Sequence, residues 1–362
     1  MIKPGPAFTR PRTPAAKCFH LVRLNPIVTR SELVEATGLS QPTITRATTA
    51  LLQAGLIQER TDLTRTKGRG RPTVPLEVAE NNWLLAGIAI GTSSTYIGLY
   101  DTKGRTIRED DITTPVASLS EADFIEHIMA GINRLTAGLD QALVSVGVTT
   151  SGQVDEEGLV YAPNLGWNGV DIAERLRFQF SVPVVVTAAI PAILGSETQA
   201  ADIASEDKVL VLFADDSIGA ALSNDDGVQQ LTPLTDPQGR PAQDSLSTAA
   251  VLKKAAEQGV TVDSIADTPR SILDERAHDL GVVAARLVRE HHPNTVVVAG
   301  SAFVDDPQAP RRFASAVREE APDAEVQLRK IPTHREIVRA VARTVALDPL
   351  LRVPLELRKF RV

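Results

Sequence analysis

One strand pattern occurs twice in this chain, and it constrains most of the fold. The stretch "LLAGIAIGTSSTYIGLYDTKG" (84–104) contains an apolar strand, a turn of small residues, a second strand and a tight turn. The stretch "KVLVLFADDSIGAALSNDDG" (208–227) repeats this order. The first copy is followed by an amphipathic segment and by another buried strand, "ALVSVGVTTSG". The repeat predicts an α/β body made of two related halves with a cleft between them.

Charge is unevenly distributed along the chain. Residues 1–75 hold twelve lysines or arginines and four acidic residues, a net charge of +8, whereas the whole chain carries −7. The remaining residues therefore carry −15. This asymmetry predicts a small basic head attached to a large acidic body.

The basic head contains the signals of two short consecutive helices. Thr29 and Glu32 fit a capping box that opens the first helix, and Gly38 ends it. Ser40 is placed to cap the second helix, and Pro42 fits its first turn, where a missing N–H costs nothing. An upstream segment, "AAKCFHLVRLNP", supplies a supporting helix. Two short helices joined by "TGLS" are the layout of a helix-turn-helix.

The second helix separates an apolar face from a polar one. Spacing near 3.6 residues turns Ile44, Thr48, Leu51 and Leu52 inward. We expect the side chains at its exposed start to contact DNA in the major groove; they are Ser40, Gln41, Thr43, Thr45 and Arg46. Gln41 can read an adenine edge, Thr43 can meet a thymine methyl or a phosphate, and Arg46 can bind a phosphate or guanine.

A basic, glycine-rich turn follows the helices. The segment "GLIQERTDLTRTKGRGRPTVPLEV" predicts two strands around this turn, which together form a wing. Lys67, Arg69 and Arg71 would then lie along phosphates or enter the minor groove, where arginine is favoured at A·T-rich positions. The alternative interpretation of the turn alone is a flexible, solvated linker. Its position beside the helix-turn-helix favours the wing.

Other features exclude several classes of protein. No apolar run reaches the roughly 18 residues of a membrane helix, and the proline-rich start has no apolar core of signal-peptide type. We therefore expect a cytoplasmic protein. The single cysteine, Cys18, excludes an internal disulfide and a multi-thiolate metal site, and we interpret it as a small buried side chain. The histidines show no i, i+4 pair, so neither a metal site nor a cofactor is expected.

Three stretches together resemble the ROK family, which groups sugar-responsive bacterial repressors and sugar kinases. They are "TRSELVEATGLSQPTITRATTALLQAGLIQE", "GRGRPTVPLEV" and "GVTTSGQVDEEGLVYAPNLGWNGVDIAERL". The resemblance implies an actin-like, ribonuclease-H-like sugar kinase fold behind a winged helix, as in the repressor branch. The expected domains are a winged helix at 1–80 and two ribonuclease-H-like subdomains at 81–190 and 191–362. A C-terminal helix can return to the first subdomain.

The chain departs from the family at the positions that carry kinase chemistry. Ala89 stands where the family has an Asp in its first phosphate loop, and Ala188 and Ala189 stand where it has Asn-Asp, whose Asp is the catalytic base. A methyl group cannot accept the sugar hydroxyl proton or hold magnesium near the phosphates. Residues 228–250, where the family's zinc motif should fall, contain no His, Cys or Glu. We expect no enzyme activity and no catalytic residues.

The same departures weaken the sugar site that the resemblance implies. Candidate ligand contacts that remain are Asn164 and Trp167 of "APNLGW", and Glu197. Asn164 equally fits an Asn that fixes a turn through its own backbone, and Trp167 equally fits the core. A sugar or derivative, an apolar or differently shaped effector, and no effector at all stay open.

The sequence thus predicts a homodimeric or homotetrameric DNA-binding transcriptional regulator of repressor type on a palindromic, double-stranded operator. Such a regulator can respond to a small-molecule effector in the body cleft. Two alternatives belong to other classes. One is an ATP-dependent sugar kinase, and the other is a DNA-binding protein whose body serves only for oligomerisation, without an effector.

Overall fold

The computed structural model describes residues 7–64, 73–200, 207–224, 227–262 and 264–357. The chain divides into two compact units, of which the second comprises 206–340 and the first comprises the rest, including 341–362. The sequence-based boundary at residue 191 differs from this division, because it falls inside helix α6 (Ala189–Ala200). This helix contacts strands of the first unit, so the division comes after it.

Three helices and a pair of antiparallel strands form the head of the first unit. They are α1 (Pro14–Leu24), α2 (Arg30–Thr37), α3 (Gln41–Gln53), β1 (Ile57–Glu59) and β2 (Leu76–Val78), with a 3-10 turn, η1 (Thr61–Leu63), after β1. The two strands pair from Ile57 opposite Val78 to Glu59 opposite Leu76. Cys18 is fully buried here, and burial raises the pKa of its thiol from 9.0 to about 11, as expected for a structural cysteine.

The first unit also contains a five-stranded sheet in the order β10-β6-β3-β4-β5. Its strands are β3 (Trp83–Ile90), β4 (Ser94–Tyr100), β5 (Thr106–Thr113), β6 (Ala142–Thr150) and β10 (Val184–Ala188). β3, β4 and β5 are antiparallel, whereas β6 and β10 run parallel to β3. A small three-stranded sheet follows β6; it consists of β7 (Gln153–Val154), β8 (Val160–Ala162) and β9 (Trp167–Val170).

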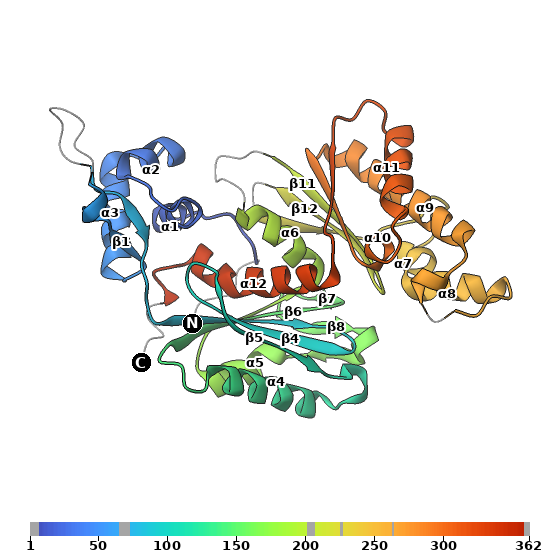
Figure 1. The fold of residues 1–362 in the computed structure, drawn as a ribbon, viewed down its shortest axis with the longest axis horizontal. Helices are drawn as coiled ribbons and strands as arrows, with labels where there is room; N and C mark the ends of the chain where they lie inside the picture. The colour runs from blue at the N-terminus through green and yellow to red at the C-terminus, as the bar shows by residue number, and fades with distance from the viewer. Residues whose placement is uncertain (1–6, 65–72, 201–206, 225–226, 263, 358–362) are drawn as a thin grey trace. The chain divides into compact units, whose positions relative to one another are not determined.

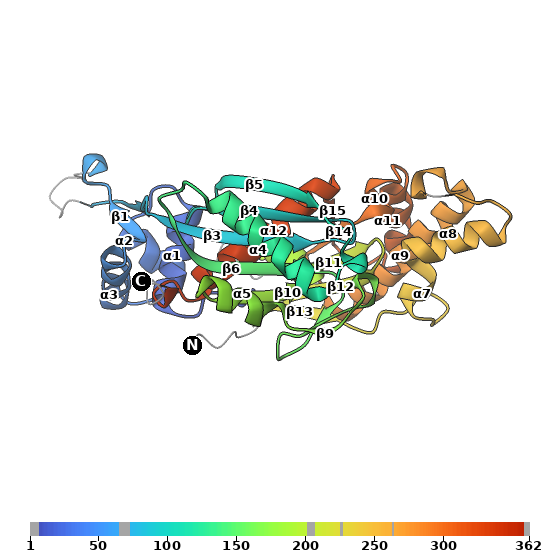
Figure 2. The same ribbon diagram turned by 90° about the horizontal axis from the view of Figure 1, so that it is seen from below.

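Helices cover both faces of the five-stranded sheet. Figures 1 and 2 show α12 (His334–Arg352) on one face and α4 (Glu121–Thr136) with α5 (Ile172–Phe180) on the other. Two further 3-10 turns, η2 (Val116–Ser118) and η3 (Pro163–Leu165), contact each other.

Three glycines lie in a row across this sheet, and two of them, Gly87 and Gly147, let α12 approach it closely. Gly147 of β6 pairs with Gly87 of β3, and Gly87 pairs with Gly98 of β4. A Cβ atom on Gly87 would collide with the backbone carbonyl of Ala342, and one on Gly147 with that of Val345. Both carbonyls belong to α12, so the missing side chains make room for the helix backbone.

The second unit repeats the sheet topology of the first. Its sheet has the order β13-β12-β11-β14-β15, with β11, β12 and β13 antiparallel and β14 and β15 parallel to β11. The strands are β11 (Val209–Ala214), β12 (Ile218–Asn224), β13 (Gly227–Leu231), β14 (Thr295–Ala299) and β15 (Gln327–Lys330). The remaining elements are α7 (Ala242–Leu246), α8 (Thr248–Glu257), η4 (Ile265–Asp267), α9 (Arg270–His291), α10 (Ser301–Val304) and α11 (Ala309–Glu320). The duplication expected from the strand pattern is therefore present in the fold.

Within the described ranges, no helix combines the length and the apolar character that crossing a membrane requires.

Candidate nucleic-acid interface

The turn between α2 and α3 is fixed by local hydrogen bonds. Thr29 donates its backbone N–H to Glu32 Oε2 at 2.7 Å, and the Glu32 N–H donates to Thr29 Oγ1 at 3.3 Å, which completes the predicted capping box. Gly38 ends α2 in the left-handed region, with φ of +66°. These local signals set the direction in which α3 leaves the turn.

Helix α3 is packed by one face and exposed on the other. Ile44, Thr48 and Leu51 are fully buried, while Leu52 is partly buried against the same core. The Thr48 hydroxyl donates to the Ile44 carbonyl at 2.9 Å, so its burial leaves no unmet donor. The predicted inward face is therefore confirmed, and it fixes which side chains face solvent.

Helix α3 carries four of the eight predicted DNA contacts. Gln41, Thr45 and Arg46 are exposed, and Thr43 is half-buried. Thr45 Oγ1 donates to the Gln41 carbonyl at 2.9 Å. Among the described residues Arg46 has no hydrogen bond or ion pair, which leaves its guanidinium available to an anion.

Ser40 lies at the N-cap position of α3, but its side chain makes no capping hydrogen bond. Its hydroxyl instead lies 2.9 Å from the Thr43 hydroxyl. The prediction that this side chain caps the helix is wrong, because the two hydroxyls bind each other. Ser40 itself remains exposed at the start of the helix.

Two arginines of the head have structural roles that the sequence did not reveal. Arg30 donates from Nη2 to Glu59 at 2.7 Å and from Nε to the Thr48 hydroxyl at 3.2 Å. Arg60 binds Asp62 at 2.6 Å and Glu77 at 3.0 Å. Glu59 lies 29 residues from Arg30 in the sequence, whereas Asp62 lies only two residues from Arg60. Of these pairs, only Arg60–Asp62 is close enough in the sequence to be expected from it.

The wing residues Lys67, Arg69 and Arg71 lie outside the described residues. The described strands on either side of them, β1 and β2, pair in the antiparallel manner that a wing requires. Arg60 Nη1 also binds Glu77 across these strands. The role of the three cations stays a prediction.

The head is joined to α12 and to the sheet of the first unit by one continuous core. Phe19 and Leu33 of the head lie in the same buried core as Tyr100 of β4 and Leu350 of α12. Asp348 of α12 is 1% exposed. Its carboxylate accepts hydrogen bonds from the Phe8 N–H at 2.7 Å and from Arg352 Nε at 2.8 Å.

Trp167 lies in a buried core of the first unit. Its side chain is 5% exposed and packs edge-on against Phe124 of α4, with ring centroids 5.1 Å apart. This burial favours the packing role over the ligand contact, which stays a prediction. An aromatic residue next to a glycine turn has the same sequence signal in both roles, and only its burial separates them.

The other two candidate ligand residues lie on different elements. Asn164 of η3 is exposed, and its amide nitrogen donates to the Ser151 hydroxyl at 2.9 Å instead of to its own backbone. Glu197 lies on α6 and is half-buried. Both belong to the first unit.

The alanines at the family's kinase positions lie at the ends of strands. Ala89 is the penultimate residue of β3 and is 7% exposed, and Ala188 ends β10 at 4% exposure. Ala189 begins α6. The correspondence of these three alanines to the family's carboxylate and amide positions stays a prediction. The structure describes no group of three or more His, Cys, Asp or Glu residues that could hold a metal ion in its described ranges.

Solved structures show the fold of this chain in other proteins. A ROK family transcriptional regulator, a homologue of the Escherichia coli Mlc protein, superposes with a TM-score of 0.75 and 19% identity over 95% of this chain and 98% of that one. The ROK hexokinase of Thermus thermophilus superposes with a TM-score of 0.58 and 18% identity over 73% of this chain and 98% of its own. These superpositions show that this chain shares its fold with a ROK regulator and, over the body, with a ROK hexokinase.

Sequence comparison gives the family. The model of the ROK family matches residues 85–228. A protein of Mycobacterium tuberculosis named as a transcriptional regulator is 30% identical over 345 residues, which cover 83% of this chain and 77% of that protein. The DNA-binding transcriptional repressor Mlc of Escherichia coli is 24% identical over 230 residues, or 62% of this chain and 56% of Mlc. The chain belongs to the ROK family.

Proposed function

We propose that this ROK family member is a DNA-binding transcriptional regulator of repressor type. Its head acts as a winged helix-turn-helix, in which α3 enters the major groove and the segment between β1 and β2 is the wing. The observation that carries the proposal is the exposed polar face of α3, where the Arg46 side chain has no partner among the described residues, on a head whose residues 1–75 carry a net charge of +8. Relatives named as transcriptional regulators support it.

The contacts follow from the chemistry of the exposed side chains. Gln41 donates to and accepts from an adenine edge, and Arg46 binds a guanine edge or a phosphate. Thr43 and Thr45 contact a thymine methyl or a phosphate, with Ser40 beside them at the helix start. Arg69 and Arg71, together with Lys67, reach phosphates or the adjacent minor groove.

A single head of this size makes few base contacts, so two heads are needed for tight and specific binding. The protein therefore binds an inverted repeat as a homodimer or homotetramer. The shared core of head and α12 supports this arrangement, because it ties the head to the body without a free linker between them.

The body is proposed to bind a small-molecule effector and to have no kinase activity. Ala89, Ala188 and Ala189 supply neither a proton acceptor nor a ligand for magnesium. Asn164 and Glu197 are the proposed effector contacts, since both carry polar side chains that are not fully buried. A sugar or sugar derivative is the proposed effector.

The salt dependence of operator binding tests the head. We expect Arg46→Gln, or Arg69→Ala with Arg71→Ala, to weaken binding and to reduce the slope of log affinity against log salt by about 0.9 per lost phosphate contact. The matched control is Arg134→Ala, because Arg134 is an exposed arginine on α4 that pairs with Asp110. The control should retain both affinity and slope in a fluorescence titration at several salt concentrations.

Two results would contradict this role. An unchanged slope in the Arg69/Arg71 variant would make the basic turn a linker. Equal losses in the Arg134 control would mean that any positive charge on the surface contributes, without a defined interface on the head.

A further inference from the structure

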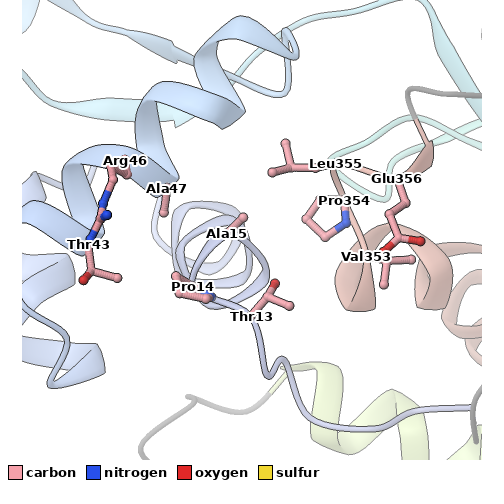
Figure 3. A pocket seen from close by; sticks show the side chains of 10 residues that line it. All are labelled: Thr13, Pro14, Ala15, Thr43, Arg46, Ala47, Val353, Pro354, Leu355 and Glu356. Carbon is pink, nitrogen blue, oxygen red and sulfur yellow. The ribbon is translucent and has the colours of Figure 1, made fainter.

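A pocket of about 490 Å³ opens between α1, α3 and the segment that follows α12. All of its walls belong to the first unit. Figure 3 shows Arg46 and Thr43 of α3 on one side, Pro14 and Ala15 of α1 in the middle, and the segment 353–356 on the opposite side. Its volume lies within the range of roughly 300–1,000 Å³ that is usual for small-molecule sites.

The lining of this pocket, which we call the head pocket, is mainly apolar. Apolar side chains from three separate elements contribute to it; they are Pro14, Ala15, Ala47, Val353, Pro354 and Leu355. Ala47 is 7% exposed and Ala15 is 8% exposed, so both side chains form walls of the pocket instead of lying on the open surface. An apolar ligand body therefore gains free energy by leaving water for this site.

The polar side chains of the head pocket differ in whether they have a hydrogen-bond partner within the protein. Thr13 Oγ1 accepts the Ala16 N–H at 3.1 Å, and Thr43 Oγ1 lies 2.9 Å from the Ser40 hydroxyl. Arg46 has no partner among the described residues, and its side chain runs along α3 beside Thr43 (Figure 3). Its planar guanidinium is suited to a carboxylate, which it can bind through two parallel hydrogen bonds.

Glu356 limits the charge that an occupant can carry. It is exposed on the wall opposite Arg46, and its carboxylate has no partner among the described residues. A ligand with a second anionic group at that end would meet a like charge. The pocket thus favours one negative charge at the Arg46 side and an uncharged apolar body across the remaining walls.

We propose that the head pocket binds a small apolar monocarboxylate and that this ligand competes with DNA. Thr43 and Arg46 line the pocket and are also proposed DNA contacts, so a bound carboxylate occupies groups that the operator needs. This inference rests on the proposed DNA-binding function. It places a regulatory ligand on the head, separate from the effector proposed for the body.

Binding is tested with three probes of similar size and different charge: benzoate, benzyl alcohol and benzylamine. Full-length protein labelled with ¹³C in its alanine methyl groups reports occupancy through Ala15 and Ala47. Benzoate should shift both resonances in a saturable manner and at lower concentration than benzyl alcohol or benzylamine, of which benzylamine can pair only with Glu356. Equal responses to all three probes would exclude recognition of a carboxylate.

Two variants and a matched control locate the site. Val353→Phe fills the pocket from the side of segment 353–356 and should abolish the benzoate shifts. Leu355→Ala removes a wall without adding bulk and should weaken binding, which keeps the test usable where the larger side chain impairs folding. Val260→Phe introduces the same change at a 38%-exposed position of the second unit and should leave benzoate binding intact. Shifts that persist in both pocket variants would overturn the proposal.

Competition is measured on an operator fragment by fluorescence anisotropy. Benzoate at ten times its Kd should weaken operator binding on the order of tenfold, because a competing ligand acts by mass action. The same effect should be lost in Val353→Phe and kept in Val260→Phe. Benzoate shifts together with unchanged operator affinity would contradict competition.

The outcomes separate this inference from the function on which it rests. Failure to bind any DNA, with or without benzoate, would refute the regulator while the methyl shifts could still establish the pocket. Normal operator binding without methyl shifts would refute the pocket alone. A further comparison uses a chain truncated after Leu357. If benzoate shifts the methyl resonances of this truncated chain and not those of the full chain, residues after Leu357 fill the pocket, and the proposal is overturned.

Discussion

Trp167 shows how burial bears on the role of a motif residue. The stretch "APNLGW" carries the family resemblance, and a Trp in such a stretch fits a ligand wall as well as a core. In the structure it packs on Phe124 and is 5% exposed, so its role is packing. Asn164, three residues earlier, remains exposed and polar.

Replacement of Trp167 separates these two roles. Trp167→Ala should lower the free energy of unfolding by about 3–5 kcal/mol, because it removes a buried aromatic side chain and leaves a cavity. Urea unfolding followed by circular dichroism measures this loss. The matched control is Phe178→Ala on α5, since Phe178 is 89% exposed and its loss should change stability by no more than about 0.5 kcal/mol. Comparable effects of the two changes would contradict the packing role of Trp167.

At the level of elements, α12 depends on the glycine row of the first sheet. Gly87→Ala should destabilise the protein by about 1–3 kcal/mol, because the new methyl group would meet the backbone carbonyl of Ala342. Gly131→Ala on α4 is the comparison: its methyl group would meet only the ends of Ile97 and Ile112, and alanine is the better helix former. Thermal unfolding measures the stability of both variants. A Gly87→Ala protein as stable as the Gly131→Ala protein would exclude close packing of α12 on the sheet.

Elements with local signals could be predicted from the sequence, and those set by distant contacts could not. The capping box at Thr29 and the turn at Gly38 depend on neighbours within a few residues, so α2 and α3 follow from the sequence. The strand pattern likewise predicted two related halves that begin with paired strands, and both are present. The division after α6 and the pairing of Arg30 with Glu59 depend on contacts made after folding. The head pocket was not predicted for the same reason, since its walls come from 13–15, 43–47 and 353–356.

For the whole molecule, we proposed that a kinase-like fold carries methyl groups at the positions that kinase chemistry needs. A panel of hexoses and amino sugars should stimulate no ATP turnover above background, because Ala189 cannot accept the hydroxyl proton. The same panel, screened by thermal shift, should contain a compound that stabilises the wild type and loses this effect with Asn164→Ala. Turnover that disappears in a Glu197→Gln variant would restore the kinase, and a stabilising effect that survives Asn164→Ala would remove Asn164 from the site.

Selection of bound fragments from random DNA by the purified full-length protein tests the proposed function most directly. We predict enrichment of an inverted repeat, flanked by A·T pairs where the wing reaches the minor groove, with affinity that falls as salt rises. Enrichment should be lost in Arg46→Gln and kept in Arg134→Ala. Salt-sensitive binding without any enriched sequence would contradict a sequence-reading α3 and leave the basic head as a nonspecific anchor.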